Sequence, residues 1–391
     1  MIIPPHLAHL PPPSTAAQAL SAQLSALIAH EITAAGGGIS FARYMELALY
    51  APGLGYYSAG SRKLGEGGDF ITAPEMSPLF ARCLARQLAQ LHAYGLHRVL
   101  EIGAGSGVLA ADVLLEMDAL GCAPESYWIL ELSGDLRERQ RELIAQRAPA
   151  WAHRVCWLES LPTQFEGVIL ANEVLDATPA QVVTTRNGEV LEAGVQHHAA
   201  RNSFHWFESK APETLRRAAE GIALPADNYR TEINLSARAL VTSLAQALTR
   251  GVMLFIDYGY PAREFYHPQR ALGTLMCHYR HHAHDDPLVL VGLQDITTHV
   301  DFSAIAASAQ DGGAQVCGYA TQAQFLINCG ITALLAAIPA TDTRAYAPLA
   351  AQAQKLLSPA EMGELFKVIA LGKSVDVALS GFARGDKSHT L

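Results

Sequence analysis

A glycine-rich turn between a predicted strand and a predicted helix constrains this chain more than any other feature. Residues 99–102 predict a buried strand that runs directly into Gly103, Ala104, Gly105 and Gly107, and the residues after Gly107 predict a helix over 108–117. Glycine at such a turn leaves the backbone free of side chains, so a nucleotide-like ligand can approach it closely. The third glycine comes one residue earlier than in the dinucleotide-binding fingerprint, so the spacing indicates a different ligand class.

A carboxylate follows the second predicted strand. Residues 126–131 predict this strand, and Glu131 ends it 131 − 103 = 28 positions after Gly103, which leaves room for one helix and a return crossover. A carboxylate at this position can accept hydrogen bonds from both hydroxyls of a ribose. The alternative interpretation is an ordinary strand–helix turn and a surface glutamate. The turn and the acid together, at this spacing, favour a ligand site.

Two further apolar runs, over residues 167–171 and 251–257, predict strands buried on both faces. Neither alternates cleanly between apolar and polar positions, and each ends in polar or acidic residues, which is typical of parallel strands. The chain is therefore predicted to form a doubly wound α/β sheet with ligand groups at the carboxyl ends of its strands. No Gly-Lys-Ser/Thr phosphate cradle is present, so a nucleoside without phosphates fits better, and S-adenosylmethionine is the best candidate.

The composition limits the functional class and predicts a compartment. Of 391 residues, 50% are hydrophobic and 17% charged, which supports a large core, and the formal charge of -9 argues against a general nucleic-acid binder. The six cysteines include no Cys-x-x-Cys pair, so neither a disulfide framework nor a zinc site is expected. No apolar run reaches the roughly 20 residues that span a bilayer. Because no export signal is visible either, we predict a cytoplasmic protein without a membrane span.

The predicted elements suggest a division of the chain. Residues 1–38 form a helical lead-in, and residues 39–391 form one domain with a lid segment at about 53–77, an insertion at about 178–235 and a helical insertion at about 319–360. The first insertion opens with a hairpin that turns at Asn187-Gly188. A helix over 236–250 leads into the strand at 252–257, and helices over 321–336 and 345–357 precede a last strand over 365–371. The insertions also offer surface for a homodimer.

Several longer segments carry a family resemblance. Residues 68–72 read Gly-Asp-Phe-Ile-Thr and residues 292–297 read Gly-Leu-Gln-Asp-Ile-Thr; these two are the most specific, and residues 40–45, 101–107, 171–177 and 256–259 add to them. From about Ile39 to Lys373 the chain resembles the MidA-like methyltransferases, whose mitochondrial members are complex I assembly factors that methylate arginine. The resemblance implies a class I methyltransferase sheet, S-adenosylmethionine as cofactor, and a protein arginine acceptor on a respiratory-complex-type subunit. The chain departs from the family pattern at 174–179 and at 229–235. These departures bear on the identity of the acceptor more than on cofactor binding.

The resemblance also suggests roles for the polar residues after the predicted strand at 167–171. Methyl transfer from a sulfonium is an in-line displacement, so the protein mainly positions the acceptor. Asn172, Glu173 and Asp176 lie where related folds place the acceptor nitrogen. For an arginine acceptor, Glu173 would hold the guanidinium and assist its loss of a proton, with Asp176 as the second choice. The alternative is that Glu173 stabilises the start of a following helix.

Three other groups have open assignments. Asp69 and Thr72 belong to a segment that would cover the cofactor as a lid, or else form a structural turn before a helix. The His-rich residues 277–286 carry metal-ligand types at a spacing that matches no standard site, so we expect a polar loop at the substrate mouth and no metal. His299 is either a base or a hydrogen-bonded structural histidine.

Two rival functions stay open at this stage. One is a methyltransferase for another acceptor, a small molecule or RNA, although the acidic charge weakens the RNA version. The other is a non-catalytic assembly chaperone that retains the fold. A protein that keeps the fold but has lost catalysis is expected to have lost part of its cofactor motif. Here Gly103, Gly105 and Glu131 are all present.

Overall fold

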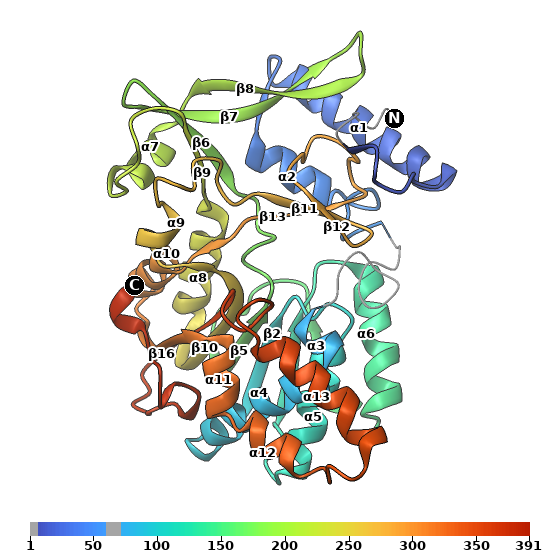
Figure 1. The fold of residues 1–391 in the computed structure, drawn as a ribbon, viewed down its shortest axis with the longest axis vertical. Helices are drawn as coiled ribbons and strands as arrows, with labels where there is room; N and C mark the ends of the chain where they lie inside the picture. Colours follow the sequence, from blue (N-terminus) through green and yellow to red (C-terminus); the bar gives the residue numbers. More distant parts are fainter. Residues whose placement is uncertain (1–6, 60–71) are drawn as a thin grey trace. The chain divides into compact units, whose positions relative to one another are not determined.

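The structure, a computed structural model, describes residues 7–59 and 72–391. Its contacts divide the chain into two compact units, here called the first and second unit (Figure 1). The first unit comprises Met1–Phe70, Leu175–Ala239 and Ala262–Asp301, and the second comprises Ile71–Val174, Leu240–Pro261 and Phe302–Leu391. The boundary at residue 38 suggested by the sequence is a different division and stays a prediction.

A twisted sheet forms the centre of the second unit. Its strands are β2 (Arg98–Ile102), β3 (Ser126–Leu130), β4 (Val155–Leu158), β5 (Phe165–Asn172), β10 (Leu248–Tyr260), β15 (Gln315–Thr321) and β16 (Phe366–Lys373). They lie in the order β15-β16-β10-β5-β2-β3-β4. The five strands from β10 to β4 are parallel, and β16 is antiparallel to both of its neighbours. The strand order reverses between β2 and β5, so the predicted doubly wound α/β sheet is confirmed.

Both faces of this sheet are buried. Val99, Val168 and Val252 are cross-strand neighbours in one core cluster with the helices. The next residues along the strands point to the opposite face, and Leu100 and Ile169 there are at most 1% exposed. Burial on both faces explains the continuous apolar runs in the sequence.

The helices of the second unit cover the sheet and pack on one another. They are α3 (Ala73–Met76), α4 (Pro78–Ala93), α5 (Val108–Ala119), α6 (Gly134–Arg147), α10 (Phe302–Asp311), α11 (Gln322–Asn328), α12 (Ile331–Ala336) and α13 (Thr343–Leu357). α4 packs against α5, α11, α12 and α13, whereas α10 packs against β10, β15 and β16 (Figure 1). α8 (Leu235–Ala247) leads into β10 and contributes residues to both units.

The first unit has its own antiparallel sheet. Its strands are β1 (Ile39–Ser40), β6 (Gln181–Arg186), β7 (Glu189–His198), β8 (Ser203–Lys210) and β9 (Tyr229–Ile233), and its helices include α1 (Thr15–Ala34), α2 (Phe41–Tyr50), α7 (Glu213–Glu220) and α9 (Ala262–Phe265). The order is β1-β7-β6-β9, and β8 pairs with β7. The hairpin predicted at Asn187-Gly188 is present as β6 and β7, and both turn residues have positive φ. α1 and α2 pack on β7 (Figure 1).

The His-rich segment is not the polar loop that the sequence predicted. It forms a second small sheet of β11 (Met276–Tyr279), β12 (His282–His284) and β13 (Asp295–Thr297). Cys277 and His284 are buried cross-strand partners in it. The family-like motif at 292–297 stabilises the neighbouring turn, because the amide of Gln294 donates to the carbonyls of Asp286 and Val289. Alternation of buried and exposed residues over such short strands is too brief to be recognised in the sequence.

Two predicted helices end elsewhere than expected. The helix over 236–250 stops at Ala247, because Leu248 already pairs with Phe165 of β5. The helix over 321–336 is preceded by strand β15 and is divided into α11 and α12 at Gly330, whose φ of 86° ends the helical path. Within the part of the chain that is described, no helix is long and apolar enough to cross a membrane.

The second unit depends on a close approach between two glycines. Gly251 of β10 lies opposite Gly167 of β5, and a Cβ atom on Gly251 would come within 1.8 Å of the Gly167 carbonyl oxygen. Its φ of 150° is also unfavourable for other residues. Any side chain here must push the two central strands apart.

We therefore expect Gly251→Ala to lower the free energy of unfolding by about 3 kcal/mol, through overpacking and backbone strain. Gly121→Ala is the matched control, because Gly121 has positive φ but open space around it, and it should lose about 1 kcal/mol. Urea unfolding of the two variants measures the difference, and equal losses would contradict the close-approach explanation.

Candidate active site

The glycine turn has the open backbone that the sequence predicted. Gly103, Gly105 and Gly107 have φ of 64°, 54° and 87°, values that disfavour residues with a side chain. A Cβ on Gly107 would lie 3.2 Å from the Cα of Gln140, so α6 also approaches the turn closely. Gly107 is the N-cap of α5 and has no side chain to cap it, and the Val108 N–H donates to the Ser106 hydroxyl at 3.4 Å. The start of α5 therefore lies at a turn whose glycine backbone a ligand can reach.

Strand pairing brings three of the predicted motifs to one edge of the sheet. Ile102 at the end of β2 pairs with Leu130 of β3 on one side and with Ala171 of β5 on the other. The residues that follow these pairs are Gly103, Glu131 and Asn172. The N–H of Gly103 donates to the Leu130 carbonyl at 3.0 Å, which fastens the turn to β3.

Glu131 is a buried carboxylate held by hydrogen bonds. It is 9% exposed, and its Oε1 accepts from the Ser133 N–H at 2.9 Å. Burial raises the pKa of Glu131, and donors from Ser133 and Gln140 oppose this rise. A buried carboxylate needs further donors, and the two hydroxyls of a ribose would supply them.

Gln140 on α6 is a site residue that the sequence did not reveal. Its side-chain amide donates to the Gly105 carbonyl at 2.9 Å and to Glu131 Oε2 at 3.2 Å. It is fully buried. A single glutamine on a polar helix has no recognisable pattern, so only the tertiary structure connects the turn and the acid through it.

Glu101 is a second buried acid beside the turn. It is 2% exposed and accepts a hydrogen bond of 2.6 Å from the Tyr127 hydroxyl. Burial raises the pKa of Glu101 to about 7, with a further contribution from the charge of Glu131. Two acids at the turn favour a ligand that carries positive charge, such as a sulfonium with an ammonium group.

Leu132 supplies an apolar surface next to Glu131. Its side chain is 74% exposed although it directly follows a buried carboxylate. An apolar side chain gains free energy when a flat ring covers it. The open glycine turn, the buried acid and the exposed leucine together fit an adenosine ligand that lacks phosphates, and S-adenosylmethionine meets these requirements.

Asn172 and Glu173 form a polar pair at the end of β5. The Asn172 side-chain amide donates to Glu173 Oε1 at 3.0 Å, and the Glu173 N–H donates to the Ile256 carbonyl at 2.9 Å. Glu173 has a φ of 53°, an uncommon conformation for glutamate. No helix follows, since residues 173–180 are turns and irregular backbone. The alternative role of Glu173 as a helix-stabilising residue is therefore wrong.

The other predicted site residues are distributed differently. Asp176 is buried and belongs to the first unit, where its backbone carbonyl accepts from the Thr298 N–H. Thr72 occupies the N-cap of α3 without making a side-chain cap bond. Asp69 lies outside the described residues, so the lid assignment stays a prediction. The same segment contributes a contact that the sequence did not reveal, because Glu75 accepts a hydrogen bond from Ser106 of the glycine turn.

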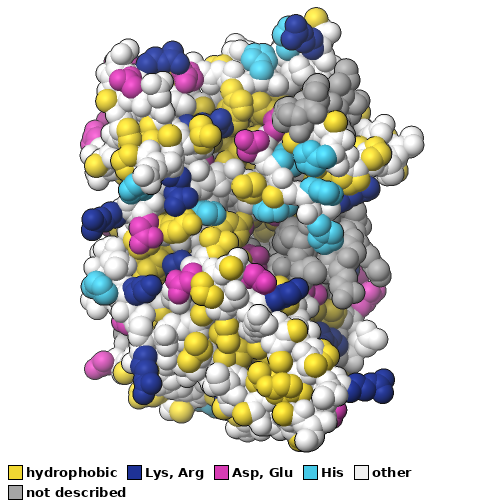
Figure 2. All heavy atoms as spheres, viewed as in Figure 1, with side chains coloured by type: hydrophobic (Ala, Val, Ile, Leu, Met, Phe, Trp, Pro, Cys, Tyr) yellow, Lys and Arg dark blue, Asp and Glu magenta, His cyan; other side chains and the backbone are white. Residues whose placement is uncertain are grey.

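The histidines of the first unit do not assemble a metal centre in the described residues, where no group of three or more His, Cys, Asp or Glu is placed to hold an ion. Figure 2 shows several histidine side chains on the visible surface of its upper half, and His281 and His282 are among the exposed residues. His299 donates through its backbone N–H to the Thr274 hydroxyl at 3.0 Å.

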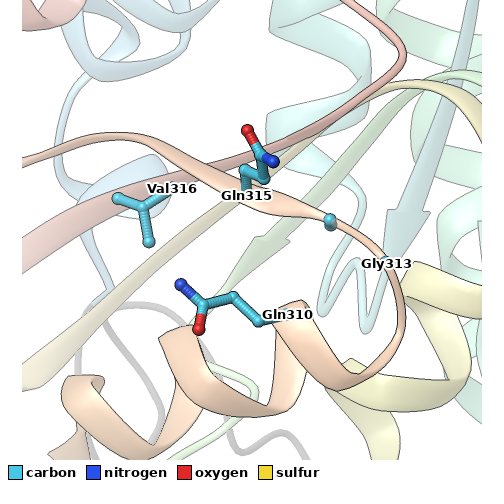
Figure 3. Close-up of a pocket in the computed structure, with 5 residues that line it drawn as sticks. Gln310, Gly313, Gln315 and Val316 are labelled. Carbon is cyan, nitrogen blue, oxygen red and sulfur yellow. The ribbon is translucent and has the colours of Figure 1, made fainter.

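An open hollow of about 430 Å³ lies elsewhere on the second unit. Figure 3 shows Gln310 of α10 and Gln315 and Val316 of β15 around it. Gln315 begins β15, and the pairing of both strands with Gly372 of β16 places it level with Val252, in the amino-terminal half of β10. The hollow is thus at the amino end of the strands, opposite the glycine turn, and it has no titratable side chain in its lining.

Glu101 predicts a pH dependence of stability. A carboxyl whose pKa rises from 4.5 to about 7 on folding binds a proton more tightly in the folded state. The protein therefore loses stability as the pH rises from about 4.5 to about 7, by about 3 kcal/mol from this group. Glu101→Gln should unfold at a higher temperature than the wild type at pH 8 and at the same temperature at pH 4. A constant difference across this range would contradict the buried-acid interpretation.

Glu131→Gln should weaken binding of S-adenosylmethionine by about tenfold or more, because charged hydrogen bonds to two hydroxyls become neutral ones. The variant should also lose some stability, because its NH₂ group must face one of the two donors, the Ser133 N–H or the Gln140 amide, so affinity is compared at a temperature well below unfolding. Glu125→Gln is the control, since Glu125 is exposed and precedes the same strand. Calorimetric titration measures both, and equal affinities would remove Glu131 from the site.

Solved structures place this chain among S-adenosyl-ligand-binding proteins. A crystal structure of a Burkholderia thailandensis protein bound to S-adenosylhomocysteine is 51% identical, with a TM-score of 0.94, and the match covers 98% of this chain and 100% of that one. A native structure of a protein from the same organism is 50% identical, with a TM-score of 0.92 and the same coverage.

Curated relatives match most of the chain as well. The protein arginine methyltransferase NDUFAF7 of Danio rerio is 30% identical over 372 residues, which cover 85% of this chain and 83% of the relative. The protein of the same name from Rattus norvegicus is 29% identical over 374 residues, with coverages of 86% and 81%. Both are named as mitochondrial proteins, so the prediction of a cytoplasmic location is wrong by this comparison. It rested on the lack of a visible targeting segment, and such a lack specifies no compartment.

The family model described as S-adenosyl-L-methionine-dependent methyltransferase matches residues 79–320. This range contains the glycine turn, Glu131 and the polar pair at the end of β5. The cofactor and the reaction class that the sequence predicted are confirmed. The chain belongs to this family of S-adenosyl-L-methionine-dependent methyltransferases.

Proposed function

We propose that this protein transfers a methyl group to the side-chain nitrogen of an arginine in a protein, with a respiratory-complex subunit as the acceptor. Two relatives of this chain are named protein arginine methyltransferases. The acceptor class is further supported by the polar pair Asn172–Glu173, which follows the strand next to the glycine turn.

The proposal depends most on one observation, a buried hydrogen-bond acceptor atom without a donor in the described part of the chain. Asn172 Oδ1 is buried and has no hydrogen-bond donor among the described residues. The amide group of the same side chain donates to Glu173, so the oxygen faces away from that contact. An unsatisfied buried acceptor is unfavourable until a donor arrives. A guanidinium, with five N–H donors in one plane, can satisfy this oxygen and a carboxylate together.

The position of the pair relative to the cofactor turn also suits methyl transfer. A Cβ on Gly103 would lie 3.2 Å from Cγ2 of Val174, so the residue after Glu173 directly borders the turn. Glu173 keeps a left-handed backbone conformation that is strained for a residue with a side chain. Such strain is maintained where the side chain has to point in a particular direction.

In this reaction the protein has to position the acceptor and stabilise the charge of the guanidinium. When bound, S-adenosylmethionine supplies a methyl group on a sulfonium. In our proposal Glu173 and Asn172 Oδ1 hold the guanidinium so that one nitrogen faces the methyl carbon in line with the departing sulfur. As the N–C bond forms and the C–S bond breaks, Glu173 stabilises the guanidinium charge and assists the loss of one N–H proton. Asp176 stays the second choice for this role.

Glu173 gives the sharpest test. Glu173→Gln should reduce methyl transfer by about 100-fold or more while S-adenosylmethionine affinity stays within about twofold. Transfer is measured as methylarginine formed in lysate from cells that lack this protein. Glu166→Gln is the matched control, because Glu166 lies on the same strand near its amino end and pairs with Arg250, and it should retain full activity. If cofactor affinity fell together with transfer, Glu173 would belong to the cofactor site instead.

Glu173→Gly separates function from folding. Glycine relieves the left-handed strain, so this variant should gain about 1 kcal/mol of stability and still lose transfer. Methylation of other residues or of RNA by the wild type, without methylarginine, would contradict the acceptor class. Binding of the cofactor without any transfer would favour the assembly-chaperone alternative.

The respiratory-complex acceptor has an independent test. The intact mass of that complex's subunits is compared between cells with and without the protein. The proposal expects a loss of one or more methyl groups from one subunit in the deficient cells. Unchanged subunit masses would contradict a respiratory-complex acceptor. If methylarginine still formed in lysates, the proposed transfer to arginine would remain supported.

A further inference from the structure

We propose that Gln140 is a positioning residue for cofactor binding, and that Trp157 fixes the orientation in which Gln140 does so. The inference rests on Glu131 as a ligand of the cofactor ribose, and it does not depend on the arginine acceptor. Gln140 lies on α6 and Trp157 on β4. Neither belongs to the glycine turn or to the acidic strand end.

Every polar atom of the Gln140 side chain is used. Its Nε2 donates to the Gly105 carbonyl at 2.9 Å and to Glu131 Oε2 at 3.2 Å, and its Oε1 accepts from the Trp157 indole N–H at 2.8 Å. The residue is completely buried. One amide therefore connects the glycine turn, the acid and the outer strand of the sheet.

The indole determines which way the amide points. An indole N–H can only donate, so it requires the amide oxygen on its side. The NH₂ group must then face Gly105 and Glu131, both of which only accept. A flipped amide would place an oxygen against two other oxygens and would leave the indole facing an NH₂ group. Trp157 thereby excludes the wrong orientation of a side chain that is otherwise nearly symmetric.

The arrangement prepares both oxygens of Glu131 for a ligand. Oε1 accepts from the Ser133 N–H and Oε2 accepts from Gln140, so the carboxylate cannot rotate freely. Each oxygen keeps a second lone pair for a ribose hydroxyl. The Gln140 hydrogen bond also favours the ionised form of Glu131, against the effect of burial, which raises its pKa.

The first experiment compares Gln140→Leu with a matched control. Gln322→Leu also removes a fully buried glutamine from the second unit, where its amide donates to the Leu356 carbonyl. Both variants should lower the unfolding temperature of the ligand-free protein. Only Gln140→Leu should weaken S-adenosylmethionine binding in calorimetry, by about tenfold or more. Equal effects of the two variants on affinity would overturn the proposal.

The pH dependence of affinity distinguishes positioning from general destabilisation. Without its Gln140 donor, Glu131 has a higher pKa, so the loss of affinity on acidification should begin at a higher pH in Gln140→Leu than in the wild type. A merely structural role would leave this pH unchanged. When Glu131→Gln is present, Gln140→Leu should no longer shift the pH at which affinity is lost. If Glu131→Gln alone bound the cofactor as the wild type does, the assignment of Glu131 to the site would be wrong, and not only the role of Gln140.

Trp157→Phe tests the orientation step. It keeps an aromatic ring and removes only the N–H, so it should weaken binding by about threefold to tenfold. Trp128→Phe on the neighbouring strand β3 is the control and should leave affinity unchanged. Affinity that is unchanged in Trp157→Phe but reduced in Gln140→Leu would show that the amide orients itself and would overturn the role of Trp157.

Discussion

The parallel pairing of β2 with β3 on one side and with β5 on the other is the constraint on which the rest of this protein depends. Because parallel strands end at the same edge, the residues that follow Ile102, Leu130 and Ala171 are brought together there. The close approach of Gly167 and Gly251 extends this ladder to β10. The candidate cofactor and acceptor residues are thus brought to one edge by the backbone hydrogen bonds of the sheet.

The site combines groups that are unfavourable on their own. Glu101 and Glu131 are buried acids whose pKa values are raised by that burial, Asn172 buries an acceptor oxygen, and Glu173 has a strained backbone. Each of these reduces the stability of the ligand-free protein. Under the function proposed above, a cationic cofactor and an acceptor rich in N–H donors would satisfy these groups.

The two units divide the sequence motifs between them. The glycine turn and the polar pair belong to the second unit, whereas the family-like motif at 292–297 is used inside the first unit. There Asp295 accepts from the Tyr57 hydroxyl at 2.9 Å and Gln294 holds the turn before it. One of the two most specific motifs therefore stabilises the fold of the first unit, whereas the less specific glycine turn belongs to the candidate cofactor site.

The sequence by itself determined what depends on neighbouring residues: the doubly wound sheet, the glycine turn, the acid after β3 and most helices, because apolar runs and glycine conformations are local properties. It misplaced the end of α8, since the pairing of Leu248 with Phe165 is a contact between distant segments. It took the strands of the His-rich segment for a loop for the same reason. Only the tertiary structure revealed Gln140, Glu75 and the raised pKa of Glu101, because each depends on which side chains burial brings together, and no spacing along the chain encodes that.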